Sequence, residues 1–190
     1  MILAAGFSSR LGMPKALVRV HGVSLLRRTV ALAVSLRAAR VIVVVPPGAE
    51  LYRAQTRHRN VTLVRNPGRA QGLSSSVRCG LKRAWYCAGV LLLPVDLAHL
   101  KHGELKRLVS RWRSAPGRIH ATRLGLRGGG TPLILPKRLF PNALRIAGDV
   151  GLRELLNELP AAQKELLELP SARFDVDTVL DLAAARCRWT

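Results

Sequence analysis

Short apolar runs alternate along this chain with segments whose apolar residues recur at helical spacing. Strands are predicted at residues 1–5, 40–48, 61–68, 89–96, 118–124 and 131–136. Helices are predicted at 24–36, 74–85, 103–112, 149–159 and 179–187, with a connection at 125–130 and a strand end at 172–178. Such alternation predicts an α/β protein with a mainly parallel sheet.

The length of 190 residues predicts one domain, residues 1–190, large enough to bury a substantial core. No apolar run reaches membrane-spanning length, and the first residues lack the order of a signal peptide, so we expect a cytoplasmic protein without membrane contact. The cysteines, Cys79, Cys87 and Cys187, are odd in number and lack metal-ligand spacing. Disulfides are therefore not expected.

The formal net charge is +20, from 31 Lys and Arg against 11 Asp and Glu. A field of that sign attracts polyanions such as phosphate-rich ligands or nucleic acid, but it also fits a solvated basic surface. Aromatic residues make up only 4 % of the chain, which leaves few platforms for stacking single-stranded bases. Nucleic acid is therefore not the expected partner.

Ligands of open α/β sheets bind beyond the carboxyl ends of the strands. In this chain that rule selects the loop after Leu3, the loop from Asn66 to Ser76, and Asp96. Asp96 ends the apolar run 89–96 and is suited to hold Mg²⁺, although it would also serve as a turn cap. Ser74, Ser75 and Ser76 stand where serines cap a helix, and one of them is also placed to contact a ligand.

The opening segment "ILAAGFSSRLGMPK" has the composition of a polyphosphate-binding loop. Gly6 and Gly12 let the backbone approach a ligand closely, and successive N–H groups form an anion-binding concavity. Ser8 and Ser9 add hydroxyl donors, whereas Arg10 and Lys15 add positive charge. The spacing matches neither the Walker pattern nor G-x-G-x-x-G, and without further context the two bases would be ordinary surface charges.

The same segment resembles the signature L-A-A-G-x-S-x-R-x-G-x-x-K of the MobA/MocA-like nucleotidyltransferases, the family of the molybdenum-cofactor cytidylyl- and guanylyltransferases. Four further matches follow in order along nearly the whole chain. These are "RNPGRAQGLSSSVRCGL", "VLLLPVDLAHL", "GDVGLRELL" and "FDVDTVLDL". The resemblance implies a Rossmann-like three-layer α/β/α nucleotidyltransferase fold.

The resemblance also implies the reaction: transfer of a nucleoside monophosphate from an NTP to a phosphorylated acceptor, with release of pyrophosphate. Catalysis would fall to Arg10, Lys15 and Asp96, and Mg²⁺ would be held by Asp96 and Asp177. Asp175 is an alternative to Asp177, which would otherwise be the N-cap of the last helix. The expected nucleotide-binding residues are Leu3, Ala4, Ala5, Gly6, Ser8, Ser9, Arg10, Gly12, Lys15, Asn66, Gly72, Ser74 and Ser75.

Ala5 indicates which nucleotide is used, because L-A-A-G accompanies cytidine transfer in the family and L-A-G-G accompanies guanosine transfer. A methyl group there leaves less room for a large base, an effect of roughly 10–200-fold at most. CTP is therefore the expected donor. The expected acceptor is the anionic, molybdopterin-bound molybdenum cofactor, with a molybdoenzyme receiving the product.

Three positions depart from the family pattern. Relatives often have proline where this chain has Ala98, an aromatic residue where it has Arg69, and histidine where it has Thr131. The Thr131 segment faces the acceptor in the family, so the acceptor is less constrained than the reaction. Two alternatives stay open: nucleotidyl transfer to another small phosphorylated alcohol or sugar, and a non-catalytic nucleotide- or RNA-binding protein on the same fold.

Overall fold

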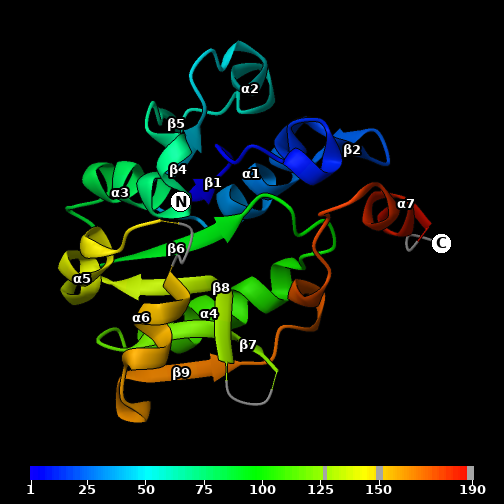
Figure 1. Cartoon of the computed structure of the whole chain (residues 1–190). Helices are drawn as coiled ribbons and strands as arrows, with labels where there is room; N and C mark the ends of the chain where they lie inside the picture. Colours follow the sequence, from blue (N-terminus) through cyan, green and yellow to red (C-terminus); the bar gives the residue numbers. More distant parts are fainter. Residues whose placement is uncertain (126–127, 149–151, 188–190) are drawn as a thin grey trace.

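The computed structural model describes residues 1–125, 128–148 and 152–187, and Figure 1 shows the arrangement. Strands in the described residues are β1 (Ile2–Leu3), β2 (Arg19–Val20), β3 (Val23–Ser24), β4 (Val41–Val45), β5 (Val61–Arg65), β6 (Gly89–Pro94), β7 (Ile119–Leu124), β8 (Gly128–Pro136) and β9 (Lys164–Leu167). Helices are α1 (Leu25–Ser35), α2 (Glu50–Gln55), α3 (Leu73–Arg83), α4 (His102–Ser114), α5 (Phe140–Arg145), α6 (Leu152–Glu158) and α7 (Val179–Cys187).

Seven strands form one sheet in the order β5-β4-β1-β6-β8-β7-β9, while β2 and β3 form a separate hairpin. β5, β4, β1 and β6 run parallel, and so do β7 and β9. β8 is antiparallel to both of its neighbours, as the opposed arrows of β6 and β8 show in Figure 1. The predicted mainly parallel sheet is therefore confirmed, with β8 as the exception.

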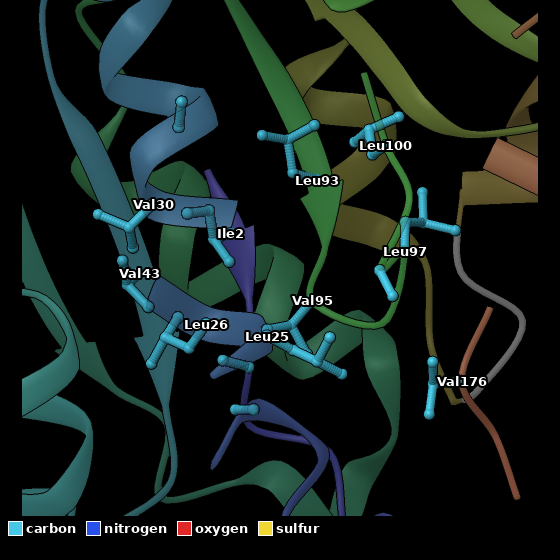
Figure 2. Close-up of a cluster of buried hydrophobic side chains, with 14 of the residues drawn as sticks. Ile2, Leu25, Leu26, Val30, Val43, Leu93, Val95, Leu97, Leu100 and Val176 are labelled. Carbon is cyan, nitrogen blue, oxygen red and sulfur yellow. The ribbon is translucent and has the colours of Figure 1, made fainter. Parts of the chain in front are cut away.

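Two apolar clusters cover the two faces of this sheet. The alternation within β4 divides its residues, because successive strand side chains point to opposite faces. Val41, Val43 and Val45 pack with residues of α1 and α4 in the cluster of Figure 2, whereas Ile42 and Val44 pack with residues of α3, α5 and α6. A fully buried Leu or Ile contributes about 1.5–3 kcal/mol, so both layers stabilise the sheet whose strand ends carry the site.

The segment 172–178 was expected to be a strand end, and that prediction is wrong. Residues Pro170–Arg173 form a short 3₁₀ helix, and residues 174–177 have no regular structure. The strand lies earlier, at β9, where Leu166 and Leu167 pair with β7. Pro170 begins the 3₁₀ helix and has no N–H for a sheet ladder, which explains why the strand does not continue.

The expected connection 125–130 is also partly wrong, because β8 begins at Gly128; Leu126 and Arg127 lie outside the described residues. Glycines let neighbouring leucine side chains pack closely here. A Cβ on Gly129 would lie 2.7 Å from Leu166 Cδ2, and one on Gly130 would lie 2.3 Å from Leu124 Cδ1. The helix predicted at 149–159 is observed as α6, with residues 149–151 outside the described residues.

Among the α-helices and strands of the described residues, the sequence did not predict α2, α5, the β2–β3 hairpin or β9. Each has six residues or fewer, too few to display a helical or strand period clearly.

Across the described ranges, no helix combines the length and the apolar character that crossing a membrane requires.

Candidate active site

A cleft of about 590 Å³ opens at the carboxyl ends of β1 and β6. Most of the sequence-predicted site residues line it: Leu3, Ala4, Ala5, Gly6, Ser8, Ser9, Arg10, Lys15, Gly72, Asp96 and Asp177. They come from strand ends far apart in the sequence. The parallel arrangement of β1 and β6 brings them to one edge of the sheet.

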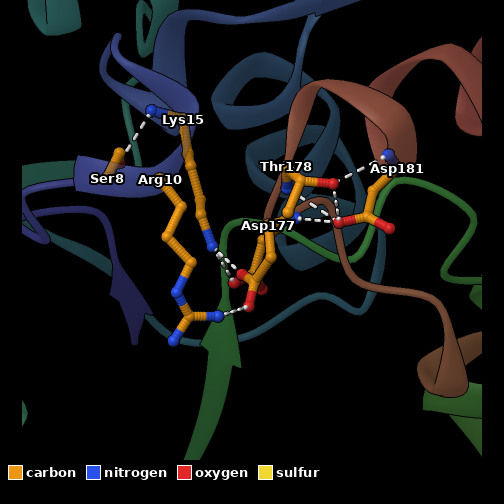
Figure 3. Close-up of polar contacts among 7 residues, drawn as sticks. Ser8, Arg10, Lys15, Asp177, Thr178 and Asp181 are labelled. Carbon is orange, nitrogen blue, oxygen red and sulfur yellow. Dashed lines mark hydrogen bonds and ion pairs between the residues drawn. The ribbon is translucent and has the colours of Figure 1, made fainter.

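The loop after β1 is shaped by residues in the left-handed region. Ser8 has a φ of 55° and Gly12 a φ of 71°, and a 3₁₀ turn over Ser9–Leu11 lies between them. Ser8 Oγ accepts a hydrogen bond from the Lys15 N–H at 3.0 Å, which closes the loop and places Lys15 in the cleft (Figure 3). A Cβ added to Gly6 would meet no protein atom within 4 Å, so the space beside this glycine is open for a ligand.

The Lys15 ammonium lies between two carboxylates, Asp96 from the middle of the chain and Asp177 from its last segment. Figure 3 shows Lys15 directed at Asp177. Nζ donates to Asp96 Oδ2 at 3.2 Å and also to Asp177 Oδ1. Asp177 Oδ2 accepts a further hydrogen bond from Arg10 Nη1 at 3.0 Å. Two carboxylates and two cations predicted as functional therefore form one connected network.

Burial and charge act in opposite directions within this network. Burial lowers the pKa of Lys15, but the hydrogen bond and charge of Asp177, together with those of Asp96, outweigh it, and the net pKa is raised. Burial raises the pKa of Asp96, and the nearby Lys15 ammonium offsets only part of that effect. Lys15 is thus held as a cation, and the charge of Asp96 depends on a positive partner.

Asp177 reaches the cleft through backbone contacts rather than through a strand. The Val176 N–H donates to the Asp96 carbonyl at 3.0 Å, which places the segment before α7 against the end of β6. Ala98 N–H donates to the same carbonyl at 3.0 Å, a bond that the proline expected here from the family pattern would not form.

The N-terminus of α7 is capped by Thr178 and Asp181, not by Asp177. Thr178 Oγ1 accepts from the Asp181 N–H at 3.2 Å, and Asp181 Oδ2 accepts from the N–H groups of Thr178 at 2.7 Å and Asp177 at 3.1 Å. This is the reciprocal capping box expected from a T-x-x-D sequence. The alternative of Asp177 as N-cap is therefore wrong, and its carboxylate stays directed at Lys15.

Replacing Asp181 by alanine tests this positioning. We expect Asp181→Ala to lower stability, as loss of a helix cap does, and to weaken catalysis by misplacing Asp177. The hydrogen bonds from Thr178 lower the pKa of Asp181, so its contribution to stability is complete above the unfolded carboxyl pKa of about 3.9 and is lost as the pH falls further. Thermal melting and turnover of Asp181→Ala and Asp181→Asn give the comparison. An alanine variant with unchanged turnover would contradict the positioning role.

Asp96 and Asp177 fit a divalent metal in their chemistry. Both offer hard carboxylate oxygens, and both converge on a single cation, the Lys15 ammonium. Within the described residues, no group of three or more Asp, Glu, His or Cys gathers as a metal site. Two carboxylates alone suit a cation that takes its remaining ligands from phosphate oxygens and water. Asp175 also lines the cleft, but Lys15 forms its ion pairs with the other two aspartates.

Four sequence-predicted nucleotide-binding residues lie outside the lining of the cleft: Gly12, Asn66, Ser74 and Ser75. Asn66 is 1 % exposed, and its Nδ2 donates to Ser75 Oγ at 2.8 Å and Ser76 Oγ at 3.0 Å. The serines do not cap α3, whose N-cap is Gly72 without a side-chain bond. Through Asn66, Ser75 and Ser76 anchor the helix to the end of β5 instead. Nucleotide contact by these four residues stays a prediction that their placement does not support, whereas Ser76 does line the cleft.

Other lining residues were not predicted as site residues. Phe7, Tyr52 and Leu73 line the cleft together with Arg69, and Thr131, Arg153 and Arg173 line it as well. The sequence signalled Phe7 only as the variable position of the loop motif, and Arg153 only as the arginine in "GDVGLRELL". Tyr52 lies on the short helix α2, for which no periodic pattern exists.

Comparison with known proteins gives consistent matches. The model of the MobA-like NTP transferase domain matches residues 1–164. The molybdenum cofactor cytidylyltransferase of Escherichia coli is 26 % identical over all of this chain and 96 % of its own length. A probable molybdenum cofactor guanylyltransferase of Trichormus variabilis is 32 % identical over 96 % of this chain and 87 % of its own. The crystal structure of Rv0371c from Mycobacterium tuberculosis superposes on this chain with a TM-score of 0.77 and 25 % sequence identity, and the match covers 97 % of this chain and 95 % of Rv0371c. A crystal structure of Rv0371c in complex with manganese is also known.

Proposed function

The chain belongs to the MobA-like NTP transferase family, and on that premise we propose that it transfers CMP from CTP to a phosphorylated acceptor of the molybdopterin type, releasing pyrophosphate. The observation that carries the proposal is the convergence of Lys15, Arg10, Asp96 and Asp177 at the loop after β1. Cations for phosphates and a pair of carboxylates for a metal are the groups that this transfer needs. A molybdoenzyme would receive the product.

The proposed transfer requires the negative charge of the triphosphate to be neutralised. An acceptor phosphate oxygen attacks the α-phosphorus, a new P–O bond forms, and the bond to the β-phosphate breaks with pyrophosphate as leaving group. Lys15 and Arg10 would bind phosphate oxygens and neutralise charge as it develops, together with N–H groups of the loop. Asp96 and Asp177 would hold a divalent cation, Mg²⁺ in our proposal, which supplies Lewis-acid neutralisation of the triphosphate when bound. No protein nucleophile is needed, because the acceptor attacks directly.

Pyrophosphate release tests this function. Each of the four NTPs is combined with Mg²⁺ and with candidate acceptors, including the molybdopterin-bound cofactor and small phosphorylated sugars and alcohols. We expect CTP and the molybdopterin-type acceptor to give the fastest release. Release only with another phosphorylated alcohol or sugar would favour the alternative acceptor class. That class stays open because Thr131, which lines the cleft, stands where the family pattern has histidine. Absence of release with every pair would leave a nucleotide-binding protein without transferase activity.

The nucleotide preference has its own test. Ala5 lines the cleft, but its side chain is 1 % exposed and packs among residues of the α3 side, so its methyl acts on the cleft wall rather than inside the open space. We expect CTP to bind more tightly than GTP in the presence of Mg²⁺, and Ala5→Gly to reduce that ratio by roughly tenfold, the lower end for one methyl group. Calorimetric titration of both proteins with both nucleotides measures it. Equal affinities in the unaltered protein would remove the cytidylyl assignment.

A further inference from the structure

The cleft has two sides about β1. In the sheet order, β4 and β5 lie on one side of β1, and β6 and β8 lie on the other. Asp96 follows β6, whereas Tyr52 on α2 follows β4, and Arg69 follows β5 in a short 3₁₀ helix (Arg69–Gln71). All three line the cleft. The predicted phosphate and metal groups therefore stand at the β6 side, and a different set of side chains stands at the β4–β5 side.

Phe7 and Arg69 meet on the β4–β5 side. The Arg69 guanidinium carbon lies over the Phe7 ring, 4.0 Å from its centroid, a distance typical of a cation–π contact. Arg69 is half-buried, and its charge is near enough to the Tyr52 hydroxyl to counteract part of the rise in pKa that burial causes there. The aromatic ring therefore holds the guanidinium in place at the lining of the cleft.

Arg69 differs in its partners from three other cations that line the cleft, Lys15, Arg10 and Arg173. Lys15 and Arg10 pair with Asp96 and Asp177, and Arg173 pairs with Glu168 at 2.7 Å. As far as the described residues show, Arg69 has no carboxylate or carbonyl acceptor for its N–H groups. Its position is thus set by stacking, while its donors stay available to a ligand.

The surroundings favour a planar, uncharged ligand group over a phosphate. Phe7 is 57 % exposed, and Leu73, which also lines the cleft, is 44 % exposed. A phosphate gains nothing from covering apolar side chains, whereas a nucleobase stacks on rings and guanidinium planes through its π-face and still accepts hydrogen bonds at its edge. With the triphosphate anchored at Lys15 and Arg10, the nucleoside would extend toward this side.

We propose that Phe7 and Arg69 together form the nucleobase-binding element of the cleft, with the base stacked against the pair and hydrogen-bonded by the guanidinium. This inference rests on the proposed function, because it takes an NTP as substrate. In this arrangement Phe7 supplies the aromatic ring, and Arg69, where the family pattern led us to expect an aromatic residue, supplies the hydrogen-bond donors.

Binding of CTP and of inorganic tripolyphosphate, each with Mg²⁺, separates base contacts from phosphate contacts. We expect Arg69→Ala and Phe7→Ala each to weaken CTP binding about tenfold, within the range of lost base stacking, and to change tripolyphosphate binding less than twofold. Arg69→Lys keeps the charge but loses the plane, so it should resemble Arg69→Ala. In turnover assays, the KM for CTP should rise while kcat stays near that of the unaltered protein.

Arg65→Ala is the control for loss of a positive charge. Arg65 is an exposed arginine at the end of β5 that does not line the cleft, and its Nη2 lies 3.8 Å from Glu50 Oε1. It should leave both affinities unchanged, and thermal melting should show that all variants fold. Equal losses of CTP and tripolyphosphate affinity would overturn the inference in favour of a phosphate contact, and unchanged CTP affinity would overturn it outright. Either result leaves the proposed function intact if the unaltered protein releases pyrophosphate. A protein that binds tripolyphosphate but not CTP would overturn both.

Discussion

Asp96→Asn is expected to abolish most nucleotidyl transfer without unfolding the protein. The substitution keeps the shape of the side chain but removes the charge that the Lys15 ammonium and a divalent metal would share. We expect turnover to fall at least about 100-fold. Loss of a residue that only hydrogen-bonds to a metal ligand already lowers activity by up to about 100-fold, and Asp96 is proposed as a ligand itself. Steady-state pyrophosphate release at saturating CTP measures the effect.

Asp96→Asn should still fold, because the structural hydrogen bonds of Asp96 are made by its backbone and not by its carboxylate. The carbonyl of Asp96 accepts the N–H groups of Ala98 and Val176, and these bonds do not depend on the carboxylate. Burial raises the pKa of Asp96, so its charge costs free energy in the folded state, and an amide removes that cost. The melting temperature should stay the same or rise slightly.

Two neighbouring substitutions complete this test. Asp177→Asn should be milder, because Asp177 is more exposed than Asp96 and water more readily replaces it as a metal ligand. Asp175→Asn should have the smallest effect of the three, since Lys15 pairs with the other two carboxylates. A larger loss in Asp175→Asn than in Asp177→Asn would exchange their roles. If Asp96→Asn keeps full turnover, the metal site is placed wrongly, and if it merely unfolds, Asp96 is a structural turn residue.

Lys15→Met is expected to have two opposite effects. Turnover should fall by roughly 10²–10³-fold, as when one preorganised donor to a developing charge is removed. At the same time, a divalent cation should bind more tightly in the absence of nucleotide, because the ammonium no longer occupies the space between Asp96 and Asp177. Manganese titration without nucleotide, followed by the electron paramagnetic resonance of free Mn²⁺, separates the second effect from catalysis.

Stability should also change in Lys15→Met. The Lys15 side chain is 18 % exposed, and its ammonium compensates two carboxylates that would otherwise face each other. We expect a loss of about 1–3 kcal/mol, below that of a fully buried pair because water reaches all three groups, and recovery on addition of Mg²⁺. Lys106→Met, on the exposed face of α4, removes the same charge away from the cleft and should change none of these properties. Unchanged manganese affinity in Lys15→Met would show that the ammonium does not compete with the metal.

Local sequence patterns were sufficient to predict the class of fold and the part of the site that lies in the loop after β1. The valine run of β4 and the apolar run before Asp96 predict buried parallel strands because their continuous apolar character and their length are properties of a few adjacent residues. The glycines, serines and cations between Gly6 and Lys15 are likewise a local signal for phosphate, and the structure places most of them at the cleft.

Tertiary structure alone decided which distant side chains complete that site. Asp177 meets Lys15 because the Val176 N–H bonds to the Asp96 carbonyl and because Thr178 and Asp181 take the helix cap, not because a strand delivers it. Asn66 looked like a ligand contact in its motif but is buried beneath α3, whereas Arg69 reaches the cleft by resting on Phe7. Periodicity encodes which face of an element is buried, but it carries no information about which partner from another segment each polar side chain will find. That choice depends on long-range hydrogen bonds and packing, which exist only once the strands have been ordered in the sheet.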